Sequence, residues 1–282
     1  MKILQISDLH FGPPFVEKVG LAVLEFAAKS QADVIVITGD LTQRAKPYQF
    51  RQAKIFIDQL SKIAQTVTVI GNHDIPLFRV VERLWRPYRL YQSFISRNLD
   101  FYVDVHDMRI VGLNSTHPYR KIKNGYLSPG QIKKCQQFFS APGAEKIQTR
   151  ILAMHHHLVP VPSFGHQEVL PQAPKLLEQL NALDVHMVLS GHIHRSFIGN
   201  SLDIYAGEKR DKGILIVSSG TTTSRRGRGA EQEKNTLNVV DIRKDDILIS
   251  HFMYFSAANS FQVISKHSYQ RYALRLEDNV QH

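Results

Sequence analysis

Short apolar runs rich in β-branched residues alternate with longer amphipathic segments along the first two thirds of the chain. The apolar runs predict strands at residues 2–7, 34–38, 66–70, 109–113, 150–154 and 185–190. The segments between them carry apolar residues at helical spacing and predict helices at residues 15–30, 48–63, 128–139 and 171–183. Ser128 and Gln131 form a capping box at the start of the third helix, with Pro129 at its first position. This alternation indicates largely parallel strand pairing and an α/β fold.

The final third of the chain has a different pattern. Three strand-like runs at residues 214–217, 237–242 and 247–252 are joined by short polar connections, which predicts a mixed or antiparallel second sheet. The sequence contains no long linker, internal repeat or low-complexity tract. We therefore expect residues 1–282 to form a single domain whose C-terminal part, residues 201–282, is rich in strands.

Residues that can bind metal ions follow five of the predicted strands. The five blocks are Asp8-Leu9-His10, Gly39-Asp40, Gly71-Asn72-His73-Asp74, His155-His156-His157 and Gly191-His192-Ile193-His194. Open α/β sheets place their sites at the C-terminal ends of strands. Residues two apart in an extended segment point the same way, so Asp8 and His10 can bind one ion together. Imidazole, carboxylate and amide ligands suit a divalent transition ion such as manganese, iron or zinc.

Each block alone also has a purely structural explanation. A turn can contain Gly-Asn-His-Asp, and a solvated loop can contain three histidines without any functional role. Five such blocks in order, each after an apolar run, favour a shared metal site over five coincidences.

The ordered blocks resemble the signature D-x-H, GD, GNH[D/E], H and GHxH of the calcineurin-like metallophosphoesterase superfamily. The resemblance covers residue 1 to about residue 220 and implies a four-layer α/β/β/α sandwich, in which helices flank two mixed β-sheets. It also implies two divalent metal ions, Mn²⁺ or Fe²⁺, with Zn²⁺ as an alternative. One ion would be held by Asp8, His10 and His194, the other by Asn72, His155 and His192, and Asp40 would bridge them.

The same resemblance assigns the chemistry. Two ions held close together lower the pKa of a bridging water and polarise the phosphoryl oxygens. His73 corresponds to the family residue that stabilises the transition state or protonates the leaving oxygen, with Asp74 as its orienting partner. In the histidine triplet, His155 is the ligand by analogy, although strand alternation alone does not decide among the three. His156 or His157 then faces the substrate or solvent.

The charge balance and two basic segments bear on the substrate. Lys and Arg outnumber Asp and Glu by 35 to 25, giving a net charge of +10 that attracts anions or serves only solubility. Residues 77–97 contain five arginines and one acid among apolar residues. They form either a basic cap over the site, with peripheral membrane contact, or an amphipathic helix pair packed on the core and broken at Pro87.

The second basic segment spans residues 220–229. Its arginines are candidate substrate ligands because guanidinium groups match phosphate oxygens, and a solvated loop is the alternative. In the superfamily, the corresponding segment returns to the rim of the site. The candidate substrate-binding residues are Arg225, Arg226, Arg228 and His156.

Cellular location follows from weaker signals. Cys135 is the single cysteine, which excludes an intramolecular disulfide and fits a reducing compartment. No apolar run reaches the length of a membrane span, and the N-terminal run is too short for a signal peptide. We expect a cytoplasmic protein of undetermined oligomeric state.

Within the superfamily, the pattern most resembles bacterial cyclic-nucleotide and glycerophosphodiester phosphodiesterases. The resemblance therefore implies a binuclear metal-dependent phosphodiesterase that hydrolyses a cyclic nucleotide or a related phosphodiester. Three alternatives remain. A UDP-2,3-diacylglucosamine pyrophosphatase of lipid A synthesis is favoured by the aromatic and basic cap. A DNA nuclease is favoured by the net charge, although no DNA-binding module follows the core, so nucleic acid is the less favoured partner. A non-catalytic scaffold subunit is disfavoured by the complete ligand set.

Overall fold

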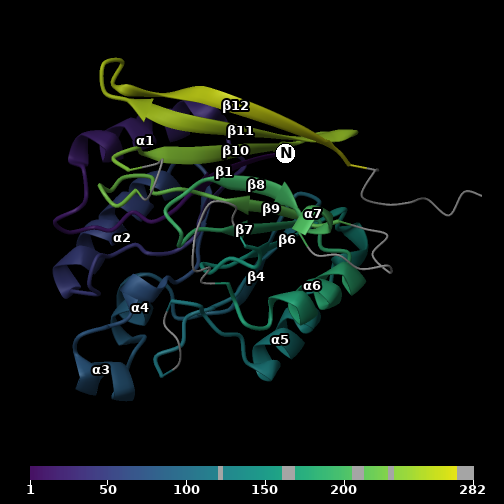
Figure 1. The fold of residues 1–282 in the computed structure, drawn as a ribbon, viewed down its shortest axis with the longest axis horizontal. Coiled ribbons are helices and arrows are strands. Elements are labelled where there is room, and N and C mark those ends of the chain that lie inside the picture. The colour runs from purple at the N-terminus through teal and green to yellow at the C-terminus, as the bar shows by residue number, and fades with distance from the viewer. Residues whose placement is uncertain (120–122, 161–168, 205–212, 228–231, 272–282) are drawn as a thin grey trace, which may run out of the picture.

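Two six-stranded mixed sheets lie face to face in the computed structural model, which describes residues 1–119, 123–160, 169–204, 213–227 and 232–271 (Figure 1). The first sheet has the order β12-β11-β10-β1-β2-β3. Its strands β1, β2 and β3 run parallel. β10 pairs antiparallel with β1, and β11 and β12 extend the sheet from β10, each antiparallel to the strand before it. The strands are β1 (Lys2–Ile6), β2 (Val34–Ile37), β3 (Gln65–Thr68), β10 (Thr236–Ile242), β11 (Asp246–Phe255) and β12 (Ser260–Gln270).

The second sheet has the order β4-β5-β6-β7-β9-β8. Its four central strands are parallel, and an antiparallel strand closes each edge. The strands are β4 (Phe101–Val105), β5 (Met108–Gly112), β6 (Thr149–Ala153), β7 (Met187–Ser190), β8 (Phe197–Asn200) and β9 (Leu215–Ser218).

Helices cover the outer face of each sheet. Helices α1 (Glu17–Ser30) and α2 (Pro47–Ser61) pack on the first sheet, and α5 (Pro129–Phe139) and α6 (Ala173–Ala182) pack on the second. The shorter elements are η1 (Asn72–Asp74), α3 (Val80–Trp85), α4 (Arg89–Phe94), η2 (Ala144–Lys146) and α7 (Ser201–Ile204). None of the helices within the described ranges is long and apolar enough to cross a bilayer.

Strand alternation divides the core into three apolar layers. In β1, Leu4 points to the helices of the first sheet, whereas Ile3 points to the second sheet. Ile110 of β5 likewise faces the first sheet, and its neighbour Val111 faces α5 and α6. Each layer excludes water from both elements that border it, so the predicted four-layer sandwich is confirmed.

The C-terminal strands depart from the prediction of a separate second sheet. β10, β11 and β12 join the first sheet beside β1, whereas β9 joins the second sheet beside β7. The short polar connections correctly predict that these strands form hairpins. They do not show which of the two sheets a hairpin joins. β4, β8 and β12 were not predicted because they are edge strands, in which polar or glycine residues and incomplete burial interrupt the apolar pattern.

The capping box of α5 is present as predicted. The Ser128 hydroxyl accepts a hydrogen bond from the Gln131 backbone N–H, and the Gln131 side chain accepts one from the Ser128 N–H. We expect Ser128→Ala to lower the free energy of unfolding by about 1 kcal/mol, because an N-terminal donor of the helix loses its partner. Urea denaturation measures the change. Ser140→Ala, at the exposed C-terminal end of the same helix, should leave stability unchanged; equal losses in both variants would contradict the prediction.

Candidate metal centre

The ligand candidates lie on loops that follow β1, β2, β6 and β7 and in η1. Backbone hydrogen bonds continue beyond the strands and align these loops: the Asp8 N–H donates to the Gly39 carbonyl, and the Gly191 N–H donates to the His155 carbonyl. The two sheets are joined at this edge because the His192 N–H donates to Asp8 Oδ2 over 3.0 Å. All of the predicted ligands therefore gather at one end of the sandwich.

The first ligand group consists of Asp8, His10, Asp40 and His194, which are all buried and offer ligand atoms within 4.8 Å of one another. His194 Nε2 lies 3.3 Å from Asp8 Oδ1, and His10 Nε2 lies 3.7 Å from Asp40 Oδ2. Both carboxylate oxygens are buried and have no hydrogen-bond donor among the described residues. Such oxygens cost free energy unless a cation neutralises them, so this group fits a divalent metal ion.

The second ligand group consists of Asn72, His155 and His192. Asn72 Oδ1 lies 3.0 Å from His155 Nε2 and 3.0 Å from His192 Nδ1. The Thr38 carbonyl accepts a hydrogen bond from His155 Nδ1, so Nε2 is the ring nitrogen that faces Asn72 and that would bind an ion after losing its proton. Asp40 Oδ1 approaches the same nitrogen to 3.4 Å. Asp40 thus presents one carboxylate oxygen to each group.

Burial and charge determine the protonation of these residues. Burial holds the pKa of His10 and His192 well below the ordinary value and lowers that of His194 to about 3, so all three imidazoles are neutral, as metal ligands must be. Burial acts against the charge of Asp40, but the neighbouring His155 and His73 hold its pKa well below the ordinary value. Burial also opposes a charged His155, yet the Asp40 carboxylate raises the His155 pKa to about 9. Asp40 is therefore ionised.

The backbone at the centre is strained. Eleven non-glycine residues in the described ranges have positive φ, and five of them belong to the two ligand groups. Those five are Asp8, His10, Asp40, His192 and His194, with φ between 50° and 74°. Left-handed backbone is unfavourable for residues with a Cβ, so its concentration here indicates a functional constraint.

His73 lies at the edge of the centre, half-buried. Its Nδ1 donates to the Gln43 carbonyl over 2.9 Å, and Arg226 Nη1 approaches its Nε2 to 3.3 Å. The Asp74 carboxylate does not contact this imidazole. It accepts hydrogen bonds from the backbone N–H groups of residues 41, 42 and 71, whereas the His73 imidazole is hydrogen-bonded to the Gln43 carbonyl. Burial raises the pKa of Asp74 to about 7, against the effect of these donors.

The other predicted substrate-binding residues differ in their burial and in their contacts. Arg226 also donates to the Gln43 side chain over 3.1 Å, whereas the Arg225 side chain is exposed. His156 is fully buried, with its Nδ1 2.8 Å from the Ser115 hydroxyl, so the arrangement does not support the expected substrate contact. Arg228 lies outside the described residues.

Two supporting features were missed at the level of sequence. Gln43 contacts His73 through its main-chain carbonyl and Arg226 through its side chain. Thr221 and Thr223 donate hydroxyl hydrogen bonds to the carbonyls of Asp8 and Leu9, which attach the basic loop to the first ligand block. The loop therefore returns to the rim of the centre.

The sequence profile of the calcineurin-like phosphoesterases matches residues 1–196. The chain belongs to this family. It is accordingly a metal-dependent phosphoester hydrolase, as the ligand groups indicate. The phosphoesterase is 25% identical to a Rhodococcus erythropolis protein named "Probable cyclic nucleotide phosphodiesterase", over 76% of this chain and 69% of the relative. It is 26% identical to a cAMP/cGMP dual specificity phosphodiesterase of Mycobacterium tuberculosis, over 73% of this chain and 63% of the relative.

The fold of the phosphoesterase is also similar to that of a purple acid phosphatase from yellow lupin (Lupinus luteus) seeds. The TM-score is 0.71 at 12% sequence identity, over 95% of this chain and 53% of the other. At that identity the similarity concerns the fold alone, and it agrees with the sandwich of two mixed sheets.

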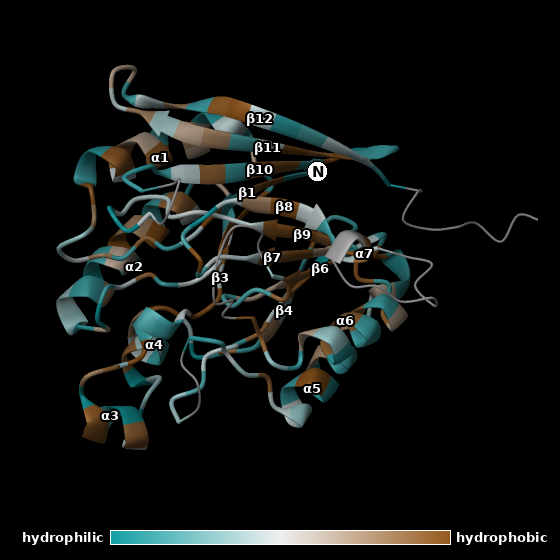
Figure 2. Cartoon of the chain, viewed as in Figure 1, coloured by the Kyte–Doolittle hydropathy of each residue, from teal (hydrophilic) through white to brown (hydrophobic). Residues whose placement is uncertain are grey.

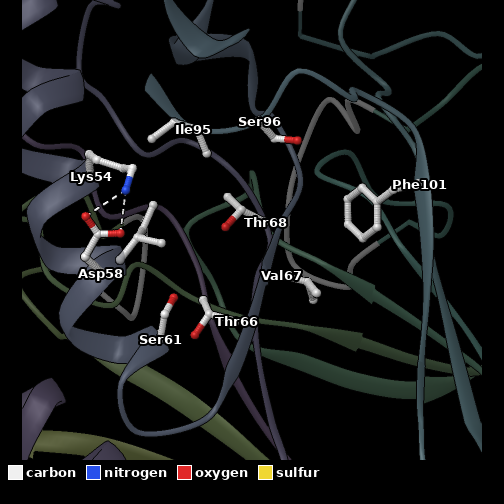
Figure 3. Close-up of a pocket in the computed structure, with 10 residues that line it drawn as sticks. Lys54, Asp58, Ser61, Thr66, Val67, Thr68, Ile95, Ser96 and Phe101 are labelled. Atoms are coloured by element: carbon white, nitrogen blue, oxygen red, sulfur yellow. Dashed lines mark hydrogen bonds and ion pairs between the residues drawn. The ribbon is translucent and has the colours of Figure 1, made fainter. Parts of the chain in front are cut away.

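A cavity of about 320 Å³ lies apart from the ligand groups of the phosphoesterase (Figure 3). It is bordered by α2, β3 and the residues after α4, and the Lys54 ammonium facing it is paired with Asp58. None of the predicted site residues lines this cavity. We therefore place the reaction at the ligand groups.

Gly71 is required by close packing at the centre. A Cβ atom there would collide with the backbone nitrogen and carboxylate of Asp40. We expect Gly71→Ala to weaken metal binding by about 10–100-fold, the range seen when the support of a ligand is lost. Titration of the apoprotein with Mn²⁺ measures the change. Gly130→Ala, whose Cβ would meet only the Ser128 hydroxyl at 3.9 Å, is the matched control. Unchanged affinity in Gly71→Ala would show that the Asp40 geometry is not critical.

Proposed function

We propose that this chain is a binuclear phosphodiesterase that hydrolyses a cyclic nucleotide or a related phosphodiester. The supporting observation is the position of Asp40, whose Oδ2 faces His10 and whose Oδ1 faces His155. A carboxylate with one oxygen toward each of two ligand groups is suited to bridge two divalent ions, Mn²⁺ or Fe²⁺ by donor chemistry, with Zn²⁺ as the alternative.

When bound, a pair of divalent ions supplies a hydroxide nucleophile near neutral pH and neutralises charge on the phosphoryl oxygens. The protein holds the ligands ready for this purpose. Burial keeps His10, His192 and His194 in the neutral form that binds metal. Hydrogen bonds to Thr38 and to the backbone fix ligand orientation, so little reorganisation is needed.

His73 and Arg226 are placed to act on the phosphate and the leaving group. The Gln43 carbonyl can only accept a hydrogen bond, so the proton of a neutral His73 lies on Nδ1 and Nε2 faces Arg226. In our proposal Arg226 binds a phosphoryl oxygen, and His73 donates a proton from Nε2 to the leaving oxygen once it is protonated. Asp74 contributes indirectly by fixing the loops that carry Asp40 and His73.

The choice of a phosphodiester over other phosphoesters is supported by the two relatives described above, which are named as cyclic nucleotide phosphodiesterases. A panel of substrates tests this choice with Mn²⁺-loaded protein: cyclic AMP, cyclic GMP, bis-p-nitrophenyl phosphate, p-nitrophenyl phosphate, UDP-2,3-diacylglucosamine and single-stranded DNA. We expect kcat/KM for a cyclic nucleotide to exceed that for the monoester by about tenfold or more. Preferred turnover of UDP-2,3-diacylglucosamine or DNA would replace this proposal with that activity, and no turnover of any substrate would favour the scaffold alternative.

We expect His73→Ala to lower kcat on cyclic nucleotides by about 10²–10⁴-fold, the usual contribution of general acid–base catalysis. The loss should be smaller with p-nitrophenyl esters, whose leaving group needs little protonation. Metal content, measured by elemental analysis, should stay at the wild-type value because His73 belongs to neither ligand group. Metal loss in proportion to activity loss would instead identify His73 as a ligand.

Arg225 and Arg226 form a matched pair of neighbouring arginines, one exposed and one at the centre. Arg226→Ala should lower kcat/KM by about 10–150-fold, because a hydrogen bond to a charged phosphate contributes about 1.5–3 kcal/mol. Arg225→Ala should stay close to wild type. Steady-state kinetics on both variants make the comparison, and equal effects would show that charge at the rim, rather than the position of Arg226, matters.

A further inference from the structure

Helix α3 has its apolar face toward solvent and its polar face toward the protein. Val80, Val81, Leu84 and Trp85 are 60%, 75%, 46% and 83% exposed, and no residue of the helix is buried. Figure 2 shows the hydrophobic colouring of α3 at the periphery of the molecule. These four positions share one side of a helix. This arrangement is the reverse of a surface helix that packs on a core.

Polar contacts hold α3 in this orientation. The Arg79 guanidinium, paired with Glu82, donates to the Ala45 carbonyl over 2.7 Å. Arg83 donates to the Pro118 carbonyl over 2.6 Å. The Tyr119 hydroxyl donates to the Leu84 carbonyl. Because the charged side chains attach the helix to the body of the protein, its apolar face is presented outward.

A basic groove borders the apolar face. It has a volume of about 820 Å³ and is lined by Trp85 and Tyr88 together with three arginines, Arg86, Arg89 and Arg97, and by no acidic residue. Glu82 lies 3.5 Å from Arg89 and outside this lining. The Arg44 guanidinium adds a further positive charge 5.0 Å from the ring centre of Phe78, which is 73% exposed. An apolar face beside a groove that is lined by three arginines and no acidic residue indicates a partner that is both apolar and anionic.

We propose that α3 and this groove bind the surface of an anionic lipid bilayer. The apolar side chains would enter the boundary between headgroups and acyl chains, and the arginines would bind lipid phosphates. A second copy of the chain fits less well, because two such faces would bring their arginines together. This surface lies near the metal centre. The Phe78 ring packs against the Arg44 guanidinium, and the residue before Arg44, Gln43, contacts His73. Docking therefore brings the metal centre to the membrane surface.

Trp85 is the single tryptophan of the chain, so its fluorescence reports on this surface alone. We expect vesicles of phosphatidylglycerol and phosphatidylcholine to shift its emission to shorter wavelength and to co-sediment with the full-length protein. Vesicles of phosphatidylcholine alone should bind much more weakly. Brominated acyl chains should quench the emission of the bound protein, which distinguishes insertion from adsorption of the net positive charge. The assay needs neither substrate nor metal turnover, so it does not depend on the proposed reaction.

Matched variants locate the binding surface. Val81→Ser together with Trp85→Ser should reduce co-sedimentation by about tenfold or more, the effect of losing at least one inserted apolar side chain. Leu21→Ser together with Ile55→Ser, at positions 63% and 57% exposed on α1 and α2, should have no effect. Arg86→Ala should weaken binding to anionic vesicles about fivefold, and Arg51→Ala on α2 much less. Circular dichroism checks that each variant is folded.

Several results would overturn the proposal. They are equal binding to neutral and anionic vesicles, emission that is unchanged by lipid, and wild-type binding by the Val81→Ser, Trp85→Ser variant. Concentration-dependent dimerisation that this variant abolishes, without vesicle binding by the wild type, would assign the surface to a second copy of the chain.

Discussion

The carboxylate of Asp40 is the constraint on which the rest of the centre depends. It is buried between the two sheets, ionised, and directed by its two oxygens toward ligand groups that come from different strands. A buried charge is unfavourable unless it is compensated. The imidazoles of His155 and His73 supply part of that compensation, and one Asp40 oxygen still has no hydrogen-bond donor. This incomplete compensation fits a site that binds a divalent cation.

The structure around Asp40 also shows features that are typical of a metal site. Five ligand residues adopt left-handed backbone, and Gly71 leaves room that a side chain would fill. Such features reduce the stability of the unliganded protein, and metal binding to the folded state restores it by mass action. The same strands continue into the apolar layers, so the position of each ligand is determined by packing that lies well outside the site.

Sequence patterns predict the centre of this fold better than its edges. The strands β1, β2, β6 and β7 are mostly apolar and buried, and metal-binding blocks follow them. Strand β12 mixes apolar and polar residues at an exposed edge and gives no clear pattern. The role of Gln43 depends partly on its main-chain carbonyl, which any residue could supply, so side-chain chemistry could not reveal it. Periodicity predicts an apolar face on each of the two helices within residues 77–97, but it does not predict what that face contacts. In α4, Leu90 and Tyr91 are buried, whereas the apolar face of α3 is exposed to solvent.

The central claim is that Asp40 lies between two metal ions. Anomalous diffraction from crystals of Mn²⁺-loaded protein tests it directly, because manganese positions are observed independently of the protein atoms. We expect two peaks about 3.5–4 Å apart, one beside each ligand group, with Asp40 between them. Asp40→Asn, whose amide has one oxygen instead of two, should lose at least one peak. A single fully occupied peak in the active wild-type protein, or two peaks that Asp40 does not contact, would contradict the account.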